Sequence, residues 1–260
     1  MQLITVTTDF GTADGFVGTM KGVIARLAPG ATVIDITHEV PPGDLRAGAF
    51  ALAASCRFFP KHTVHVAVVD PGVGSQRRAL AAQTADYFFV GPDNGVLSWA
   101  LRGEKIKAIR RLENEQYFLH PVSRTFHGRD VFAPVAAHLS RGVDIRRLGP
   151  PADDFVRLPW PEPIREADQV RGEVVYVDRF GNAITNITEQ HLSRLRRGGR
   201  GVDLGRRRLC PLAEFYQSVP KGQPLAVIGS SGFVEIAVNG GSAAARLSLS
   251  AGSPVTVRSR

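Results

Sequence analysis

The run VHVAVV at residues 64–69 constrains the fold of this chain more strongly than any other segment. It is apolar, rich in β-branched residues, and ends abruptly in Asp70-Pro71-Gly72. An apolar run of this length is typical of a parallel strand that is buried on both faces and whose carboxyl end opens into a loop. We therefore expect a central strand here, with helices covering both sides of its sheet.

Strand and helix patterns alternate through the first half of the chain. Strands are predicted at residues 3–6, 32–36, 79–82 and 87–90, and helices at residues 16–27, 45–58 and 130–139. A β-α-β-α order of this kind favours parallel strand pairing with helical crossovers. The sequence thus predicts an N-terminal α/β layer domain with a mostly parallel central sheet.

Prolines separate this half from the rest of the chain. Five of the nineteen residues from Leu148 to Glu166 are proline, which opposes regular structure and suits a linker. Short strands divided by Gly, Asn and Ser turns follow, at residues 170–177, 183–187, 225–228, 233–238 and 255–257. We expect an α/β catalytic domain at residues 1–160 and a smaller all-β, barrel-like domain at residues 161–260.

The composition, with 43% hydrophobic and 22% charged residues, is that of an ordinary globular protein. The first residues lack the pattern of a secretory leader, and no stretch approaches the roughly 18 apolar residues of a membrane span, so we expect a cytoplasmic protein. Cys56 and Cys210 have neither metal-site nor disulfide spacing, and we interpret them as isolated small hydrophobes.

The net charge of +8 raises the question of nucleic-acid binding. Much of the charge falls in two arginine-rich runs, at residues 141–147 and 194–208. Neither run contains the interleaved aromatic residues that stack on bases. We interpret both runs as solvated loops, with a nucleic-acid patch as the alternative, and expect no nucleic-acid partner.

Polar residues follow the predicted strands with regularity. They are Thr7-Thr8-Asp9, His38-Glu39, Asp70 and Asp93-Asn94. Because the carboxyl ends of parallel strands line one crevice of an open sheet, we expect these side chains to converge on a site. The glycine-rich loop after Asp70 leads into Arg77 and then into a strand, which argues against a triphosphate-binding loop. His127, next to a glycine before a helix, is a further candidate for an accessible, reactive group.

Six segments taken together resemble one protein family. They are TTDFGTADGFVGTMKG (7–22), VVDPGVGSQRRAL (68–80), GPDNGVLS (91–98), TFHGRDVFAP (125–134), DRFGNAITNI (178–187) and SSGFVEIAVNGGSA (230–243). In this order, along nearly the whole chain, they resemble the S-adenosyl-L-methionine (SAM) hydrolases, also called SAM hydroxide adenosyltransferases. Enzymes that fluorinate or chlorinate the same substrate are relatives of this family.

The resemblance implies that water attacks the ribose 5′ carbon of SAM and releases adenosine and L-methionine, without a cofactor. It assigns water activation to Asp70, Arg77 and His127. A carboxylate or an imidazole can take up a proton from water, and a guanidinium can stabilise the developing hydroxide. Substrate-binding positions implied by the resemblance are Asp9 at the ribose hydroxyls, and Phe126, Asp178, Phe180, Asn182, Ser230, Ser231 and Asn239 elsewhere on SAM.

The resemblance also implies a homotrimer whose active sites lie between subunits, with the C-terminal domain completing the SAM pocket. The halide-using relatives do not keep the histidine found here at His127. They also carry an insertion in the first domain that is absent between Asp70 and His127. Water rather than halide is therefore the implied nucleophile.

Two other functions stay open at this point. In a metal-dependent nucleoside or nucleotide hydrolase, a divalent ion would need ligands from the set Asp9, His38, Asp70, Asp93 and His127. Arg77 opposes a cation there, and His62 and His65, near the start of a strand, are expected at the surface, so we expect no metal. The second alternative is a sensor that binds SAM or adenosine on the same scaffold without catalysis.

Overall fold

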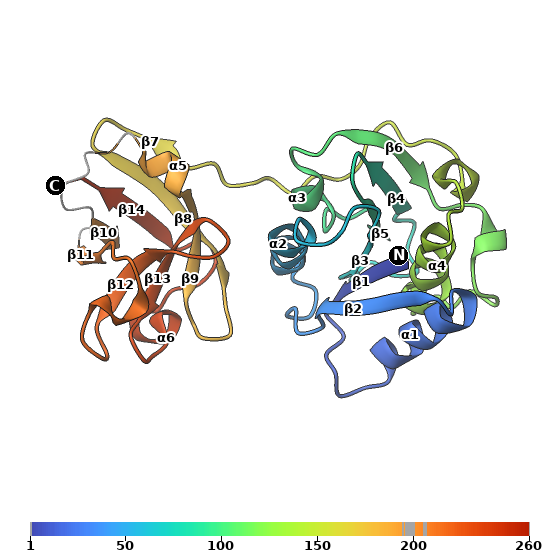
Figure 1. The fold of residues 1–260 in the computed structure, drawn as a ribbon, viewed down its shortest axis with the longest axis horizontal. Coiled ribbons are helices and arrows are strands. Elements are labelled where there is room, and N and C mark those ends of the chain that lie inside the picture. Colours follow the sequence, from blue (N-terminus) through green and yellow to red (C-terminus); the bar gives the residue numbers. More distant parts are fainter. Residues whose placement is uncertain (1, 194, 196–200, 205–206, 260) are drawn as a thin grey trace. The chain divides into compact units, whose positions relative to one another are not determined.

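The computed structural model of the chain describes residues 2–193, 195, 201–204 and 207–259. The chain divides into two compact units, Met1–Leu158 and Pro159–Arg260, which are treated separately below (Figure 1). None of the helices formed by the described residues is long and apolar enough to cross a membrane.

The first unit is built on a six-stranded sheet. Its strands are β1 (Gln2–Thr8), β2 (Ala31–Thr37), β3 (Val64–Val68), β4 (Ala79–Thr84), β5 (Phe88–Pro92) and β6 (Ile106–Arg111). The spatial order is β2-β1-β3-β5-β4-β6, and only β4 runs antiparallel to its neighbours β5 and β6. The predicted mostly parallel central sheet is confirmed, with the VHVAVV run as its central strand β3.

Helices cover both faces of this sheet. They are α1 (Phe16–Leu27), α2 (Leu45–Cys56), α3 (Ser98–Leu101) and α4 (Ala133–Ser140), with short helical turns at η1 (Glu115–Tyr117), η2 (Gly128–Phe132) and η3 (Ile145–Leu148). Val64, Val66 and Val68 point to the face packed with α1 and α4. Because side chains alternate along a strand, His65 points to the opposite face.

His65 corrects an expectation from the sequence, because it is completely buried instead of lying at the surface. The ring stacks on Phe89 and meets Tyr87 edge-on, and its Nδ1 lies 2.7 Å from the Thr5 hydroxyl. Burial lowers the pKa of His65 to about 4. The physical reason is that β3 is covered on both faces, so even its polar residue has no route to water.

His65 should make the stability of the first unit depend on pH. Between pH 6.5, the ordinary histidine pKa, and about 4, the unfolded chain binds a proton that the folded chain does not. The free energy of unfolding should therefore fall by about 3 kcal/mol as the pH drops through this window. Urea unfolding across the window should show a smaller fall for His65→Asn than for the wild type. An equal fall in both proteins would contradict the assignment.

The proline-rich segment after Leu148 begins as part of the first unit. The amide of Val156 donates to Asp93 at 2.7 Å, and the amide of Leu158 donates to the Ser98 hydroxyl at 3.1 Å. The indole of Trp99 in turn donates to the carbonyl of Leu158. This segment forms no strand or helix, so its backbone N–H and C=O groups form hydrogen bonds with side chains on the surface of the α/β layer.

The second unit is an antiparallel sheet of β7 (Ile164–Arg165), β8 (Gln169–Val177), β9 (Ala183–Thr188), β10 (Gly201–Leu204), β11 (Arg207–Pro211), β12 (Pro224–Ile228), β13 (Phe233–Val238) and β14 (Pro254–Arg258). Its spatial order is β11-β10-β14-β8-β9-β13-β12, with β7 added beside β8. Leu212, just after β11, bridges to Ala226 in β12, so the two ends of the sheet meet. The predicted barrel-like fold is confirmed. Short helices α5 (Glu189–Leu192), α6 (Ala243–Leu247) and η4 (Tyr216–Ser218) complete the unit.

The arginine-rich run at residues 194–208 is only partly described. Residues 194, 196–200 and 205–206 lie outside the described residues, but β10 and β11 are strands, so the expectation of a loop is wrong for those segments. Val202 and Cys210 face each other across this pair of strands, and both are buried. In the sequence, the many arginines interrupt the alternation of apolar and polar residues that would have predicted these strands. Cys56 and Cys210 form no disulfide and both are buried, as expected for small hydrophobic residues.

Candidate active site

Two neighbouring strands of the first unit end in carboxylates. Asp9 follows β1 and Asp70 follows β3 by two residues, and these strands are parallel partners. The Asp9 carboxylate accepts a hydrogen bond from the amide of Gly43 at 2.8 Å, and a Cβ on Gly43 would lie 4.0 Å from Pro71. The loops that carry Asp9 and Asp70 therefore both lie next to the turn at Gly43, at the carboxyl edge of the sheet.

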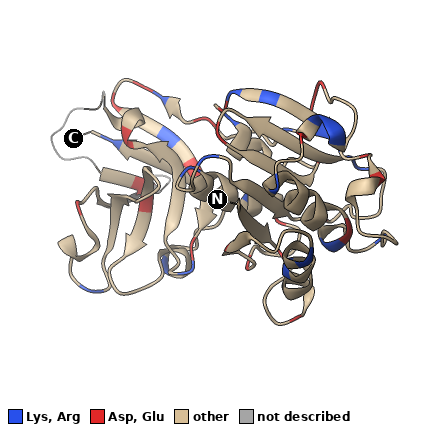
Figure 2. Ribbon diagram, turned by 45° about the vertical axis from the view of Figure 1, so that its right-hand side comes forward, with Lys and Arg blue, Asp and Glu red and all other residues tan. Residues whose placement is uncertain are grey.

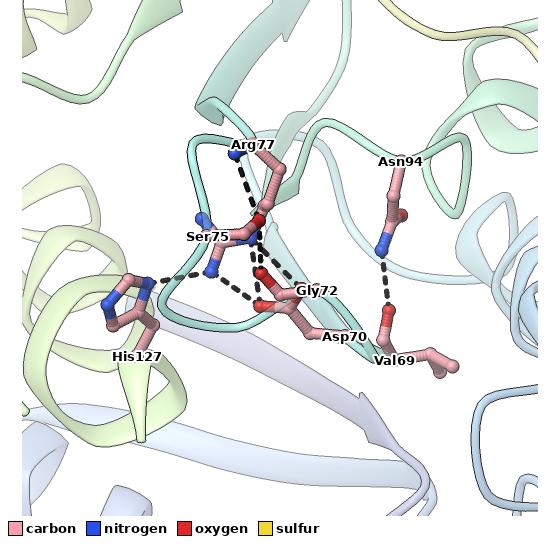
Figure 3. Close-up of polar contacts among 7 residues, drawn as sticks. All are labelled: Val69, Asp70, Gly72, Ser75, Arg77, Asn94 and His127. Atoms are coloured by element: carbon pink, nitrogen blue, oxygen red, sulfur yellow. Dashed lines mark hydrogen bonds and ion pairs between the residues drawn. The ribbon is translucent and has the colours of Figure 1, made fainter. Parts of the chain in front are cut away.

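Asp70 and Arg77 form a two-pronged ion pair. The Arg77 Nε donates to Asp70 Oδ1 at 3.0 Å, and an Nη donates to Oδ2 at 2.5 Å (Figure 3). The side chains are only 4% exposed for Asp70 and 12% exposed for Arg77. The guanidinium also lies over the ring of Phe132, 5.5 Å from its centre. A charge pair this well enclosed is held in one geometry and feels a lower dielectric than a surface pair.

His127 completes this group from a distant part of the chain. Its Nδ1 lies 2.7 Å from the same Arg77 Nη that contacts Asp70. Burial and the neighbouring Arg77 lower the pKa of His127, against smaller opposing effects of Asp70 and Asp130. His127 is the residue just before the π-turn η2, and through this turn the chain enters α4. His127 therefore lies at the start of the helix that the sequence predicts at residues 130–139. The structure thus brings Asp70, Arg77 and His127 into contact.

Gly74 holds the two loops of this group together. It has a φ of +77°, and a Cβ added there would lie 2.1 Å from the carbonyl oxygen of Arg124. The loop that carries Asp70 and Arg77 thus packs backbone to backbone against the loop that carries His127. Only glycine fits this contact.

Gly74→Ala should therefore damage the group without touching any of its side chains. The new methyl group has to displace Arg124, and a shift of about 1 Å between the loops would lower kcat about 10²-fold. Steady-state kinetics should be compared with Gly103→Ala, where φ is +80° but no atom lies within 4 Å of the added Cβ. That control carries the same backbone strain without the clash. Equal kinetics for the two variants would show that the close contact has no part in activity.

The other polar residues at the strand ends hold the scaffold. Asn94 donates to the carbonyl of Val69 at 2.8 Å and so fixes the start of the Asp70 loop (Figure 3). Asp93 is buried and accepts a hydrogen bond from the Arg78 guanidinium at 2.6 Å. His38 is buried between the Thr8 hydroxyl and Asp35.

These contacts bear on the metal-dependent alternative. Of its five proposed ligands, Asp70 and His127 contact Arg77, Asp93 contacts Arg78, and His38 is turned toward Asp35. A guanidinium in contact with two of the ligands would repel a divalent cation. Within residues 2–193, 195, 201–204 and 207–259, no group of three or more His, Cys, Asp or Glu side chains is placed to hold a metal ion.

Phe126 belongs to an aromatic cluster beside the group. Its ring centre lies 5.9 Å from that of Phe10 and 5.3 Å from that of Phe16, both in edge-on arrangements. Phe16 is 47% exposed, so the cluster reaches the surface. Since Phe10 directly follows Asp9 and Phe126 directly precedes His127, this cluster connects the Asp9 loop to the His127 loop.

A cavity of about 310 Å³ adjoins Arg77 and His127. Its wall includes Phe118, Val122 and Val131 together with the charged residues Arg78, Arg111, Glu113 and Glu115. A single water occupies about 30 Å³ of liquid, so this space holds several. Water therefore has room beside Arg77 and His127, whereas Asp70 is not among the residues that line this cavity.

The remaining predicted binding residues lie in the second unit. Asp178 closes the β8–β9 hairpin by accepting hydrogen bonds from the amides of Phe180 and Asn182 and from the Asn182 side chain. This arrangement leaves Phe180 projecting, with 78% of its surface exposed. An exposed phenylalanine on a rigid hairpin is a candidate contact for a flat apolar group.

Ser230, Ser231 and Asn239 do not form one cluster. The two serines precede β13 and Asn239 follows it, so they lie at opposite ends of a strand of six residues, about 20 Å long. The Asn239 side chain donates to the carbonyl of Val219 at 2.7 Å. A ligand that contacts both ends would have to lie along β13.

Glu235 is a notable side chain that the sequence predictions missed. It is buried in β13, accepts a hydrogen bond from the Tyr216 hydroxyl at 3.0 Å, and packs so closely on Gly229 that a Cβ there would overlap it. Burial raises the pKa of Glu235, and nearby Asp178 raises it further. The only sequence signal is one acidic residue within the apolar run FVEIAV.

Comparisons with known proteins place this geometry in context. The model of the SAM hydroxide adenosyltransferase N-terminal domain matches residues 4–149, and that of the C-terminal domain matches residues 172–256. A protein of Salinispora arenicola named (R)-S-adenosyl-L-methionine hydrolase is 45% identical over 98% of this chain and 97% of its own. A fluorinase of Actinoplanes sp. is 27% identical over 98% of this chain and 97% of its own. The crystal structure of an uncharacterized conserved protein from Thermotoga maritima matches with a TM-score of 0.93 and 40% identity, covering 99% of this chain and 100% of that one.

Proposed function

Because this chain belongs to the SAM hydroxide adenosyltransferase family, we propose that it hydrolyses S-adenosyl-L-methionine to adenosine and L-methionine. The name of the Salinispora relative points further to the (R) form of the substrate. The observation that carries the proposal is the contact of Asp70, Arg77 and His127, two of which, Arg77 and His127, line a cavity with room for water.

The chemistry of SAM fits these three residues. Its sulfur is a sulfonium, so attack on the ribose 5′ carbon expels a neutral thioether, and no general acid is needed for the leaving group. The remaining task is to activate water, which a carboxylate or imidazole base typically accelerates by about 10²- to 10⁴-fold. The guanidinium of Arg77 carries a positive charge that stabilises the negative charge developing on the attacking oxygen.

Substrate binding is proposed for residues of both units. SAM is a cation, whereas the chain has a net charge of +8, so its binding depends on local carboxylates. Basic and acidic residues are interspersed over both units (Figure 2). We assign Asp9 to the ribose hydroxyls and Phe126 to the pocket wall, and propose further contacts from Asp178, Phe180, Asn182, Ser230, Ser231 and Asn239.

Assembly and location form a separate part of the proposal. We propose a cytoplasmic homotrimer with active sites shared between subunits, on the strength of the family resemblance and of two buried cysteines that form no disulfide, as suits a reducing compartment. Light scattering of the purified protein would measure the mass of the assembly. A monomer in solution that still turns over SAM would refute shared sites.

The test of the function is product analysis in oxygen-18 water. The purified protein is incubated with each sulfonium epimer of SAM, with and without EDTA, and the products are identified by mass spectrometry. We expect adenosine labelled at its 5′ oxygen and methionine in equal amounts, from the (R) form, regardless of EDTA. Loss of activity with EDTA would favour the metal-dependent hydrolase. SAM that binds but survives would favour the sensor.

A further inference from the structure

We propose that His127 is a positioning residue that holds Arg77 through a neutral Nδ1, and that Asp70 alone accepts the proton of the attacking water. The inference rests on the proposed hydrolysis. In the resulting step, the water oxygen forms a bond to the 5′ carbon while the carbon–sulfur bond breaks and leaves its electron pair on sulfur. The water proton passes to the Asp70 carboxylate, which later releases it to solvent.

The donor and acceptor roles follow from the partner of His127. A guanidinium has only N–H donors and stays protonated in proteins, so the Nδ1 that lies 2.7 Å from the Arg77 Nη has to accept. A neutral imidazole carries one proton, and that proton is then on Nε2. With Nδ1 occupied and Nε2 protonated, His127 has no lone pair left to take a proton from water.

The orientation of the ring supports the same conclusion. The second ring nitrogen of His127 points away from Arg77 and from the Asp70 carboxylate (Figure 3). A backbone hydrogen bond with Ser123 raises the pKa of His127, as the smallest of the effects that act on this ring. Ser123 is itself fixed, because its amide donates to the fully buried carboxylate of Asp130 at 2.8 Å.

Asp70 has the complementary arrangement. Arg77 contacts both of its oxygens from one side, and each carboxylate oxygen offers two lone-pair directions, so acceptor capacity remains for water. The Arg77 Nη that contacts Asp70 also contacts His127. His127 therefore accepts a hydrogen bond from the same Nη that donates to Asp70. This second contact keeps the guanidinium in the orientation in which its Nε and Nη both reach the Asp70 carboxylate.

The proposal predicts how activity depends on pH. The charged groups around His127 are Arg77, Asp70 and Asp130, with Arg78, Arg111, Glu113 and Glu115 in the cavity wall. Because burial and Arg77 lower the pKa of His127, the ring is neutral at neutral pH. Below that lowered pKa, protonation of Nδ1 removes the acceptor and sets an imidazolium against the guanidinium. Activity should therefore fall at acid pH through loss of the Arg77 contact.

The matched variants are His127→Asn and His127→Ala. The side-chain oxygen of asparagine can occupy the position of Nδ1 and accept from Arg77, but it cannot titrate or act as a base. We expect His127→Asn to keep kcat within about tenfold of the wild type. The fall in activity at acid pH that protonation of His127 causes should be absent in this variant. His127→Ala, which removes a hydrogen bond to a charged group, should lose about 100-fold. An Asn variant as slow as the Ala variant, with SAM still bound, would overturn the proposal.

A second measurement does not depend on turnover. Nitrogen-15 NMR of the wild-type protein distinguishes protonated from unprotonated ring nitrogens, and the His127→Asn variant identifies the resonance. We expect a neutral ring protonated on Nε2, and a ring protonated on Nδ1 would overturn the proposal. If the wild type did not hydrolyse SAM, the proposed function would fail while this spectrum would still report the tautomer.

Discussion

Replacing Asp70 by asparagine is expected to lower kcat for SAM hydrolysis about 10³-fold, within the range that general-base catalysis supplies. Asparagine has nearly the same shape and can still accept a hydrogen bond from Arg77, but it does not take up a proton at neutral pH. The affinity for SAM should change little, because this carboxylate acts on water. Single-turnover kinetics and equilibrium binding of SAM would separate the two quantities.

The control for this variant is Asp93→Asn. Asp93 is also a buried carboxylate paired with an arginine, Arg78, and it lies in the same unit. Asp70→Asn removes the charge partner of Arg77, and Asp93→Asn removes one of two charge partners of Arg78, which keeps Asp154. Each substitution breaks a buried ion pair and costs stability, which thermal unfolding would measure. Only Asp70→Asn should lose kcat. If both variants lost activity in proportion to stability, Asp70 would be one more structural ion pair, and the proposed role would be wrong.

Strong periodic patterns accounted for most of the first unit. The helix predicted at residues 16–27 is α1 (Phe16–Leu27), and the VHVAVV run is β3, because an apolar stretch of this length can be buried only inside a covered sheet. The strands predicted in the second unit could be located because turns rich in Gly, Asn and Ser separate them in the sequence. Local pattern and tertiary structure agree at these places.

The sequence predictions were wrong or incomplete where the burial of a residue depends on partners that are distant in the sequence. His65 lies in the interior because Thr5, Tyr87 and Phe89 surround it, and none of these contacts is visible in the local sequence. The strands β10 and β11 were missed because arginines interrupt their apolar alternation, while pairing with β14 decides their structure. Glu235 was passed over as an ordinary strand residue, although Tyr216 comes from a separate loop to meet it.

The candidate site illustrates the same limit. Residue type and loop position suggested Asp70, Arg77 and His127, and the family resemblance grouped them. The sequence left open which of Asp70 and His127 takes the proton. That question depends on which nitrogen of His127 faces Arg77, a matter of ring orientation that only the folded loops determine.

Replacing Arg77 by lysine is expected to lower kcat about 10²- to 10³-fold, although the positive charge is kept. Arginine reaches Asp70 through Nε and one Nη and contacts His127 with the same Nη, so two nitrogens of one planar group make three contacts that fix the geometry. A lysine ammonium is a single point on a flexible stem and cannot reproduce this fork. It also loses the packing of the guanidinium over Phe132.

Arg78→Lys provides the control, because Arg78 is the adjacent residue and pairs with Asp93 and Asp154 without contact to His127. Its kcat should stay near that of the wild type. A sharper test is Arg77→Ala with added guanidinium ion, which should restore part of the activity, whereas the same ion should not restore Asp70→Asn. Arg77→Lys at more than a third of the wild-type rate would mean that charge alone suffices, and the planar geometry between Asp70 and His127 would then have no catalytic consequence.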